Sequence, residues 1–107
     1  MVRPKKCRMV NAEPGVDYFK PRAVPLMELE EVELNVEEFE AVRLKDLEKL
    51  EQIEVARRMK ISQPSLHRLL VSARNKIADA LVNGKAIKIY GGNYALIGKK
   101  RKMKKMR

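Results

Sequence analysis

Polar and basic side chains between residues 57 and 74 are of the kind that contacts nucleic acid. Glutamine can pair with adenine, and arginine with guanine, along the base edges exposed in the major groove of DNA. Serine and histidine side chains can make further contacts with a base edge or a phosphate. We therefore take as candidate base-reading residues Gln63, Ser65, His67 and Arg68.

Further basic and hydroxyl side chains surround this group and suit the phosphate backbone. Contacts to phosphates position a protein on DNA without reading its sequence. The candidate phosphate-binding residues are Arg57, Arg58, Lys60, Ser62 and Arg74.

The apolar spacing of residues 52–71, QIEVARRMKISQPSLHRLLV, predicts a helix-turn-helix that would position these side chains. Ser62 stands where an N-cap is needed, and Pro64 falls in the first turn of the second helix. Lys60 occupies a turn position where the backbone tends to be left-handed and glycine is favoured. The small residue expected where the helices cross and the apolar inward positions are Ala56, Val55, Met59, Ile61, Leu66 and Leu69.

The same apolar pattern would also suit an αα-hairpin that binds nothing, and the charge distribution favours DNA over that alternative. The 107 residues carry a formal net charge of +10. Residues 24–42 contain seven acidic residues and no Lys or Arg, whereas residues 57–107 contain fifteen Lys or Arg and one acid. A one-sided basic half favours a polyanionic partner.

Three helices are predicted, over residues 36–47, 51–60 and 63–82. The first starts from a capping pattern at Asn35 and Glu38, and we expect its acidic face to point away from DNA. Asn83-Gly84 should end the third. The C-terminal half of the third helix would pack on the body or on a second subunit. Its predicted inward stripe is Leu66, Leu69, Leu70, Ala73, Ile77, Ala80 and Leu81.

The two ends of the chain differ from this helical middle. Residues 1–25 form a Pro-rich arm with extended pieces at 6–10 and 17–20, and residues 26–34 form a helical turn or an extended connector. Residues 86–90 either make a hairpin with 94–97 or, as we favour, pair with the arm. The arm is basic and would reach a DNA backbone or minor groove, or else form an edge strand. The basic residues at its start are Arg3, Lys5, Lys6 and Arg8.

The tail, residues 99–107, is expected to be disordered. We expect it to contact phosphates through charge alone, a solubilising role being the alternative. Its basic residues are Lys99, Lys100, Arg101, Lys102, Lys104, Lys105 and Arg107.

Several function classes are disfavoured by what the sequence offers. Cys7 and His67 are the only cysteine and histidine, so we expect no zinc site, and no other metal or cofactor is predicted. No nucleophile–base pairing or phosphate-cradling glycine loop stands out, so an enzyme is not expected. No apolar run approaches a membrane span and no signal peptide is present, which predicts a cytoplasmic protein.

Four segments of the chain resemble uncharacterised protein family 0251, whose members are small prokaryotic proteins predicted to bind DNA. They read RPKKCRMV, YFKPRAVPL, LEEVELNVEEFEAVRLKDLE and ADALVNGKAIKIYGGNY, and the resemblance runs from residue 3 to residue 94. Residues 52–71 are also similar to the promoter-binding helix-turn-helix in the fourth region of sigma factors. The resemblance implies a DNA-binding fold and a regulatory role. Lys60, in place of the turn glycine, and the tail after Gly98 depart from it.

We therefore expect a mainly α fold with a trihelical, sigma-factor-like core and a small β element from the arm, a C-terminal hairpin or both. Residues 1–98 would form one domain, with the arm at 1–25, the helical core at 35–83, the strand or hairpin at 86–97 and the tail after it. The expected function is sequence-specific binding of double-stranded DNA by a homodimer that regulates transcription. An RNA-binding or ribosome-associated protein is one alternative. A module that docks on RNA polymerase through its acidic segment is another.

Overall fold

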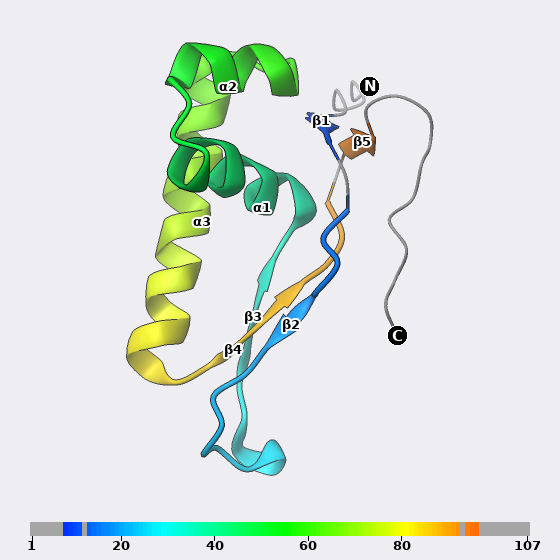
Figure 1. Cartoon of the computed structure of the whole chain (residues 1–107). Coiled ribbons are helices and arrows are strands. Elements are labelled where there is room, and N and C mark those ends of the chain that lie inside the picture. The colour runs from blue at the N-terminus through cyan, green and yellow to red at the C-terminus, as the bar shows by residue number, and fades with distance from the viewer. Residues whose placement is uncertain (1–7, 12, 93, 97–107) are drawn as a thin grey trace, which may run out of the picture.

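The computed structural model describes residues 8–11, 13–92 and 94–96, and within them the protein is mainly helical with two small β-sheets (Figure 1). This confirms the coarse fold class expected from the sequence. No helix in the described part is long and apolar enough to span a bilayer. The elements are β1 (Arg8–Val10), β2 (Tyr18–Phe19), β3 (Glu31–Leu34), α1 (Val36–Val42), α2 (Gln52–Met59), α3 (Gln63–Asn83), β4 (Ala86–Ile89) and β5 (Tyr94–Leu96).

α1 begins at the capping pattern predicted from the sequence. The Asn35 side chain accepts a hydrogen bond from the Glu38 N–H at 2.9 Å, and the Glu38 carboxylate accepts one from the Asn35 N–H at 3.0 Å. This reciprocal box satisfies two N–H groups that a helix start would leave unpaired. The helix predicted over 36–47 changes at Arg43 into a π-helical segment, Arg43–Leu47.

The α2–turn–α3 unit, residues 52–83, follows the sequence prediction closely. Lys60 ends α2 in the left-handed conformation, with φ 58° and ψ 47°. The Ser62 side chain caps α3 by accepting from the Ser65 N–H, and Pro64 lies in the first turn. Gly84, with φ 66°, ends α3 as expected. The sequence signals therefore place both ends of α3 correctly.

The strands pair across long stretches of sequence. β4 lies between β2 and β3, antiparallel to β2 and parallel to β3. β5 pairs instead with β1, in parallel, so the predicted hairpin of residues 86–90 with 94–97 is wrong. The favoured alternative, a sheet that includes the arm, is confirmed. Residues 26–34 provide both a 3₁₀ turn, Leu26–Glu28, and the strand β3.

Two connected groups of buried side chains hold the elements together. The first lies among α1, α2 and the N-terminal half of α3, and it contains all the predicted inward residues of the α2–turn–α3 unit, with Ile61 at its edge. The second joins β1, β3, β4 and α3, through Val10, Leu34, Val36, Ala73 and Ile89. Val42 packs against both groups, so the sheet that includes the arm is anchored to the helices.

The acidic side of α1, which the sequence predicts to point away from DNA, is buried within the fold. Glu37, Glu38 and Glu40 are 4%, 3% and 2% exposed. Each is paired: Glu37 with Arg8 of β1, Glu38 with Ser72 and Lys76 of α3, and Glu40 with Arg43. A buried carboxylate is tolerated when charge and hydrogen bonds compensate its lost hydration. These residues therefore tie α1 to the arm and to α3.

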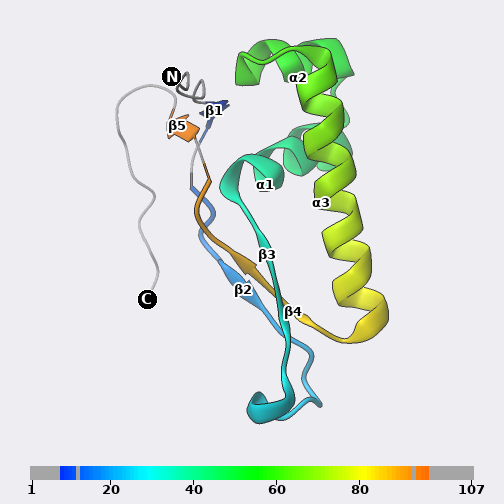
Figure 2. The ribbon, with the colours of Figure 1, turned by 180° about the vertical axis from the view of Figure 1, so that it is seen from behind.

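Two large apolar residues near the ends of helical segments are exposed, and the prediction that one of them, Leu81, faces the core is wrong. Leu47 is 73% exposed and lies in the π-helical segment, whose wider turn does not keep the three-and-four spacing of an α-helix. Leu81 is 77% exposed, because the last turns of α3 extend beyond α1 and α2 (Figures 1 and 2). Both residues remain as apolar surface near the sheet.

Candidate nucleic-acid interface

The N-terminal half of α3 presents one polar face to solvent. Gln63, His67 and Arg68 are exposed, whereas Leu66 and Leu69 on the opposite side are buried. The separation follows from the helical period, which places residues three and four apart on the same side. Three of the four predicted base-reading residues therefore lie on one accessible surface. Arg68 makes no ion pair with any described residue, so its guanidinium is available to a ligand.

Ser65, the fourth predicted base-reading residue, is half-buried and engaged in the cap of α3. Its N–H donates to the Ser62 Oγ at 3.2 Å, and its own Oγ accepts from the Ser62 hydroxyl at 3.0 Å. The Arg68 guanidinium donates to the same Ser65 oxygen at 3.4 Å. Ser62 and Ser65 therefore orient the start of the helix and the Arg68 side chain.

Two of the predicted phosphate-binding residues share a carboxylate that sequence reasoning missed. Glu54 on α2 accepts from Arg57 at 2.6 Å and from Arg58 at 2.8 Å. The hydrogen bonds from Arg57 and then Arg58 lower the pKa of Glu54 to about 2. An acid three and four residues before two arginines on a helix is a readable signal for such pairing. The pairing reduces the net charge of this cluster from two to one.

Arg74 is held away from the other phosphate candidates by an ion pair across the structure. Its guanidinium donates to the Asp46 carboxylate at 2.6 Å, and Asp46 belongs to the π-helical segment. The hydrogen bond from Arg74 keeps the pKa of Asp46 below its ordinary value. Because the contact joins residues far apart in sequence, no local pattern indicates it. Arg74 is thus the least suited of the predicted phosphate ligands.

A hollow of about 420 Å³ lies beside the turn between α2 and α3, and cations line it from two directions. Arg57 and Lys60 contribute from the α2–turn–α3 unit, and Arg8 contributes from β1. Lys60 makes no ion pair with the described residues, whereas Arg8 contacts Glu37 at 2.9 Å. Ser62 and Ser65 line the same hollow. Arg8 thus joins the predicted arm to the α3 site, and Arg3, Lys5, Lys6 and the tail lie outside the described residues.

Taken together, the fold and surface define a small, mainly helical protein whose α2–turn–α3 unit carries an exposed polar helix face beside a basic hollow. The family model described as "Protein of unknown function DUF134" matches residues 1–97, and the chain belongs to that family. It is similar to a UPF0251 protein of Caldanaerobacter subterraneus subsp. tengcongensis, with 62% identity over 98 residues, 92% of this chain and 83% of the relative.

Other UPF0251 proteins are similar to this chain over most of its length. A UPF0251 protein of Moorella thermoacetica is 63% identical over 100 residues, which cover 94% of this chain and 67% of the relative. One of Dehalococcoides mccartyi is 55% identical over 96 residues, covering 90% and 82%. These matches confirm the resemblance to family 0251 that the sequence segments indicate. No solved structure matches the chain.

Proposed function

We propose that this protein binds double-stranded DNA in a sequence-specific manner through α3. In this proposal it is a cytoplasmic protein that regulates transcription. The observation that carries the proposal is the exposed face of Gln63, His67 and Arg68 above a buried apolar face. A recognition helix needs this division, because one side must enter the major groove while the other anchors the helix.

The turn supports the assignment of a helix-turn-helix similar to that of sigma-factor region four. Lys60 adopts the left-handed turn conformation without glycine, and the inward residues of the unit are packed. The turn therefore has the geometry that the motif requires despite the departure at Lys60. In this proposal α2 lies across the backbone, and the N-terminal turns of α3 read the bases.

Phosphate contacts are assigned chiefly to the basic hollow. Lys60 and Arg8 are the cations best placed there, and Arg57 becomes available if a phosphate displaces Glu54. Exchanging one exposed ion pair for a phosphate contact costs little, because such pairs contribute about 0–1 kcal/mol. These contacts would fix the position of α3 on the duplex without selecting sequence.

The alternative that the protein docks on RNA polymerase through its acidic segment has fewer exposed carboxylates than the sequence indicates. Glu37, Glu38 and Glu40 are buried and cannot meet a polymerase, which leaves Glu28 to Glu33 of that segment exposed. The DNA proposal instead assigns base reading to Gln63, His67 and Arg68, which are exposed in the described structure. A homodimer would present two copies of α3 to a palindromic operator.

The test begins with selection of bound fragments from random duplex DNA, followed by titration of the selected site and its single-base variants at fixed salt. We expect Arg68→Ala to relax preference at one base pair in each half-site, at a cost of about 1–3 kcal/mol for the preferred base. Gln63→Ala should act in the same way at a neighbouring base pair. Binding to random DNA should change little.

Lys60→Ala is the matched control, because Lys60 is also exposed but is assigned to phosphate. It should weaken binding to selected and random DNA by similar factors. Equal losses on every sequence for Arg68→Ala would remove Arg68 from the reading residues. Absence of a selected sequence, with tight binding to single-stranded RNA, would instead favour the RNA-binding alternative.

A further inference from the structure

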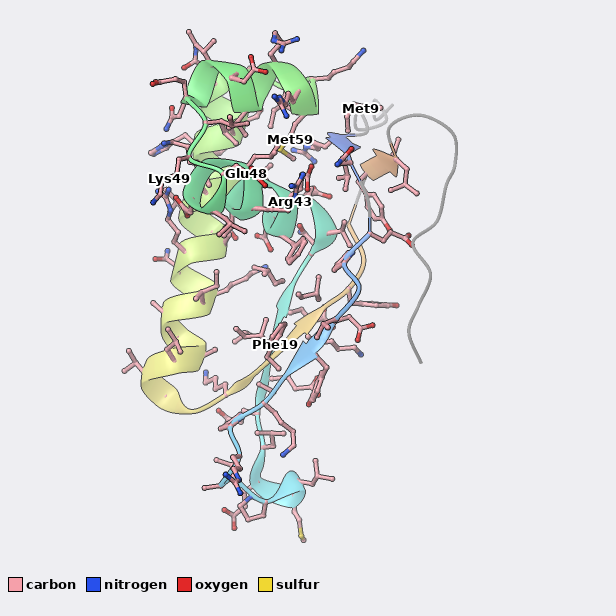
Figure 3. The ribbon with its side chains drawn as sticks, in the orientation of Figure 1. Met9, Phe19, Arg43, Glu48, Lys49 and Met59 are labelled. Carbon is pink, nitrogen blue, oxygen red and sulfur yellow. The ribbon has the colours of Figure 1, made fainter. Side chains whose placement is uncertain are left out.

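An apolar groove is lined by residues other than those of the candidate DNA-binding surface. It has a volume of about 380 Å³ and runs between the sheet and the helices. Phe19 of β2, labelled in Figure 3, lines the groove from the sheet, and Ile77 of α3 lines it from the helices. The apolar side chains that line it include Phe19, Phe39, Val42, Leu47, Ile77 and Ile87.

Some of these large apolar side chains are exposed to solvent. Phe19 is 52% exposed and Leu47 is 73% exposed. A second hollow, of about 240 Å³, continues from Phe19 and Ile87 to Leu81 at the end of α3. A continuous apolar surface of this kind on a small domain marks an interaction site.

The same chain has a projecting turn whose apolar side chains are not buried. The 3₁₀ turn Leu26–Glu28 joins β2 to β3 and lies beyond the C-terminal end of α3 in both views (Figures 1 and 2). Leu26 is 72% exposed and Met27 is 83% exposed. We call these residues, with Glu28, the tip. Two adjacent apolar side chains at a projecting turn are costly in water unless they have a partner.

We propose that the tip of one copy of this chain inserts into the apolar groove of a second copy, and that the reverse contact forms at the same time. Reciprocal insertion satisfies a two-fold axis, because each copy supplies one projection and one groove. It also buries two separate patches on each copy, which helps a small protein reach the roughly 800 Å² per partner of a stable interface.

Charge near the two surfaces is complementary. Glu28 ends the tip and is exposed, and it makes no ion pair with a described residue. Lys20 lines the second hollow, next to Phe19, and also makes no such pair. Insertion of Leu26 and Met27 would bring an acid toward a basic rim. Opposite charges at the rim fix the register of a complex more than they add affinity.

The proposal goes beyond DNA binding, and its test contains no nucleic acid, so the two can fail separately. Sedimentation equilibrium of the full chain should show a monomer–dimer equilibrium. Leu26→Ser with Met27→Ser should raise the dimer dissociation constant at least about tenfold, equivalent to about 1.4 kcal/mol. Leu47→Ser should act in the same direction from the groove side. A strictly monomeric native chain would overturn the proposal and leave the groove to another protein.

Ile53→Ser is the matched control, because Ile53 is 64% exposed on α2 and lies outside the groove. It should leave the dissociation constant unchanged. Since all the substituted residues are exposed, circular dichroism should show native helix content in every variant. A tip variant that dimerises as tightly as the native chain would show that the groove pairs with something other than the tip.

A mixing experiment tests the reciprocity directly. The tip variant retains a native groove, and the Leu47→Ser variant retains a native tip, so an equimolar mixture can form one intact junction. Mixed dimers should therefore exceed the twofold excess over each homodimer that random pairing alone would give. A charge exchange adds a second readout: Glu28→Lys should weaken association, and Lys20→Glu in the same chain should restore part of it. No enrichment of mixed dimers would refute tip-to-groove insertion.

Discussion

Removing the buried carboxylate of Glu38 should destabilise the fold more than removing an exposed carboxylate such as that of Glu33. Glu38 is 3% exposed and accepts hydrogen bonds from the Asn35 N–H, the Ser72 hydroxyl and the Lys76 ammonium. It thus completes the cap of α1 and joins α1 to α3. Glu38→Ala leaves all three donors without this acceptor at once.

The size of the effect follows from these contacts. Breaking a buried ion pair by removing one partner costs about 3–5 kcal/mol. The Lys76 side chain is 34% exposed, so water can still hydrate its ammonium group after the substitution. We therefore expect Glu38→Ala to lower the free energy of unfolding by about 3 kcal/mol. Glu38→Gln keeps an acceptor but loses the charge, and it should cost about 1–2 kcal/mol. A small domain has only about 5–15 kcal/mol of stability in total.

Urea denaturation followed by circular dichroism measures these differences. Glu33→Ala is the matched control, because Glu33 is an exposed carboxylate on β3 and should change stability by less than about 0.5 kcal/mol. If Glu38→Ala cost no more than Glu33→Ala, the buried network would not hold α1 to α3, and the reasoning would be wrong.

Three further predictions use other parts of the chain. Glu54→Gln should release Arg57 from its ion pair and so strengthen binding to all duplex DNA. In a filter-binding titration the affinity should also fall more steeply with salt concentration, and an unchanged salt dependence would contradict this. Deleting residues 99–107 should weaken binding to every sequence alike and flatten the salt dependence; a changed sequence preference would refute it. Burial and a hydrogen bond to Glu13 raise the pKa of Tyr94 to about 12. The contribution of the neutral phenol to stability is therefore complete below the pKa of about 10 that tyrosine has in the unfolded chain, and it is lost as the pH rises through about 12. Tyrosinate absorbance should lose its highest-pH step in Tyr94→Phe.

The α2–turn–α3 unit could be predicted because its signals are local. Ser62, Pro64 and Gly84 mark the ends of α3 by their own backbone and side-chain chemistry. The inward residues follow the helical period, which is fixed by geometry. The left-handed turn at Lys60 was anticipated from the motif, although lysine itself gives no sign of it.

The sheet and the charge pairs could not be predicted in the same way. β3 pairs with β4 across more than fifty residues, and alternation in a short segment does not specify a partner. Nor does a run of glutamates show that Glu38 will be buried, since burial depends on Lys76 arriving from another helix. The sequence likewise gives no sign of the contact between Arg74 and Asp46, so Arg74 is predicted from its charge alone to bind phosphate.

Amide chemical-shift mapping with a selected duplex tests the central claim most directly, since it reports where the DNA lies on the protein. The full chain, labelled with nitrogen-15, is titrated with the duplex at fixed salt. Among the described residues, shifts should concentrate at residues 60–68 and at Arg8, with little change at the tip, Leu26–Glu28. Shifts concentrated at the tip or on the sheet, with residues 60–68 unaffected, would contradict the account.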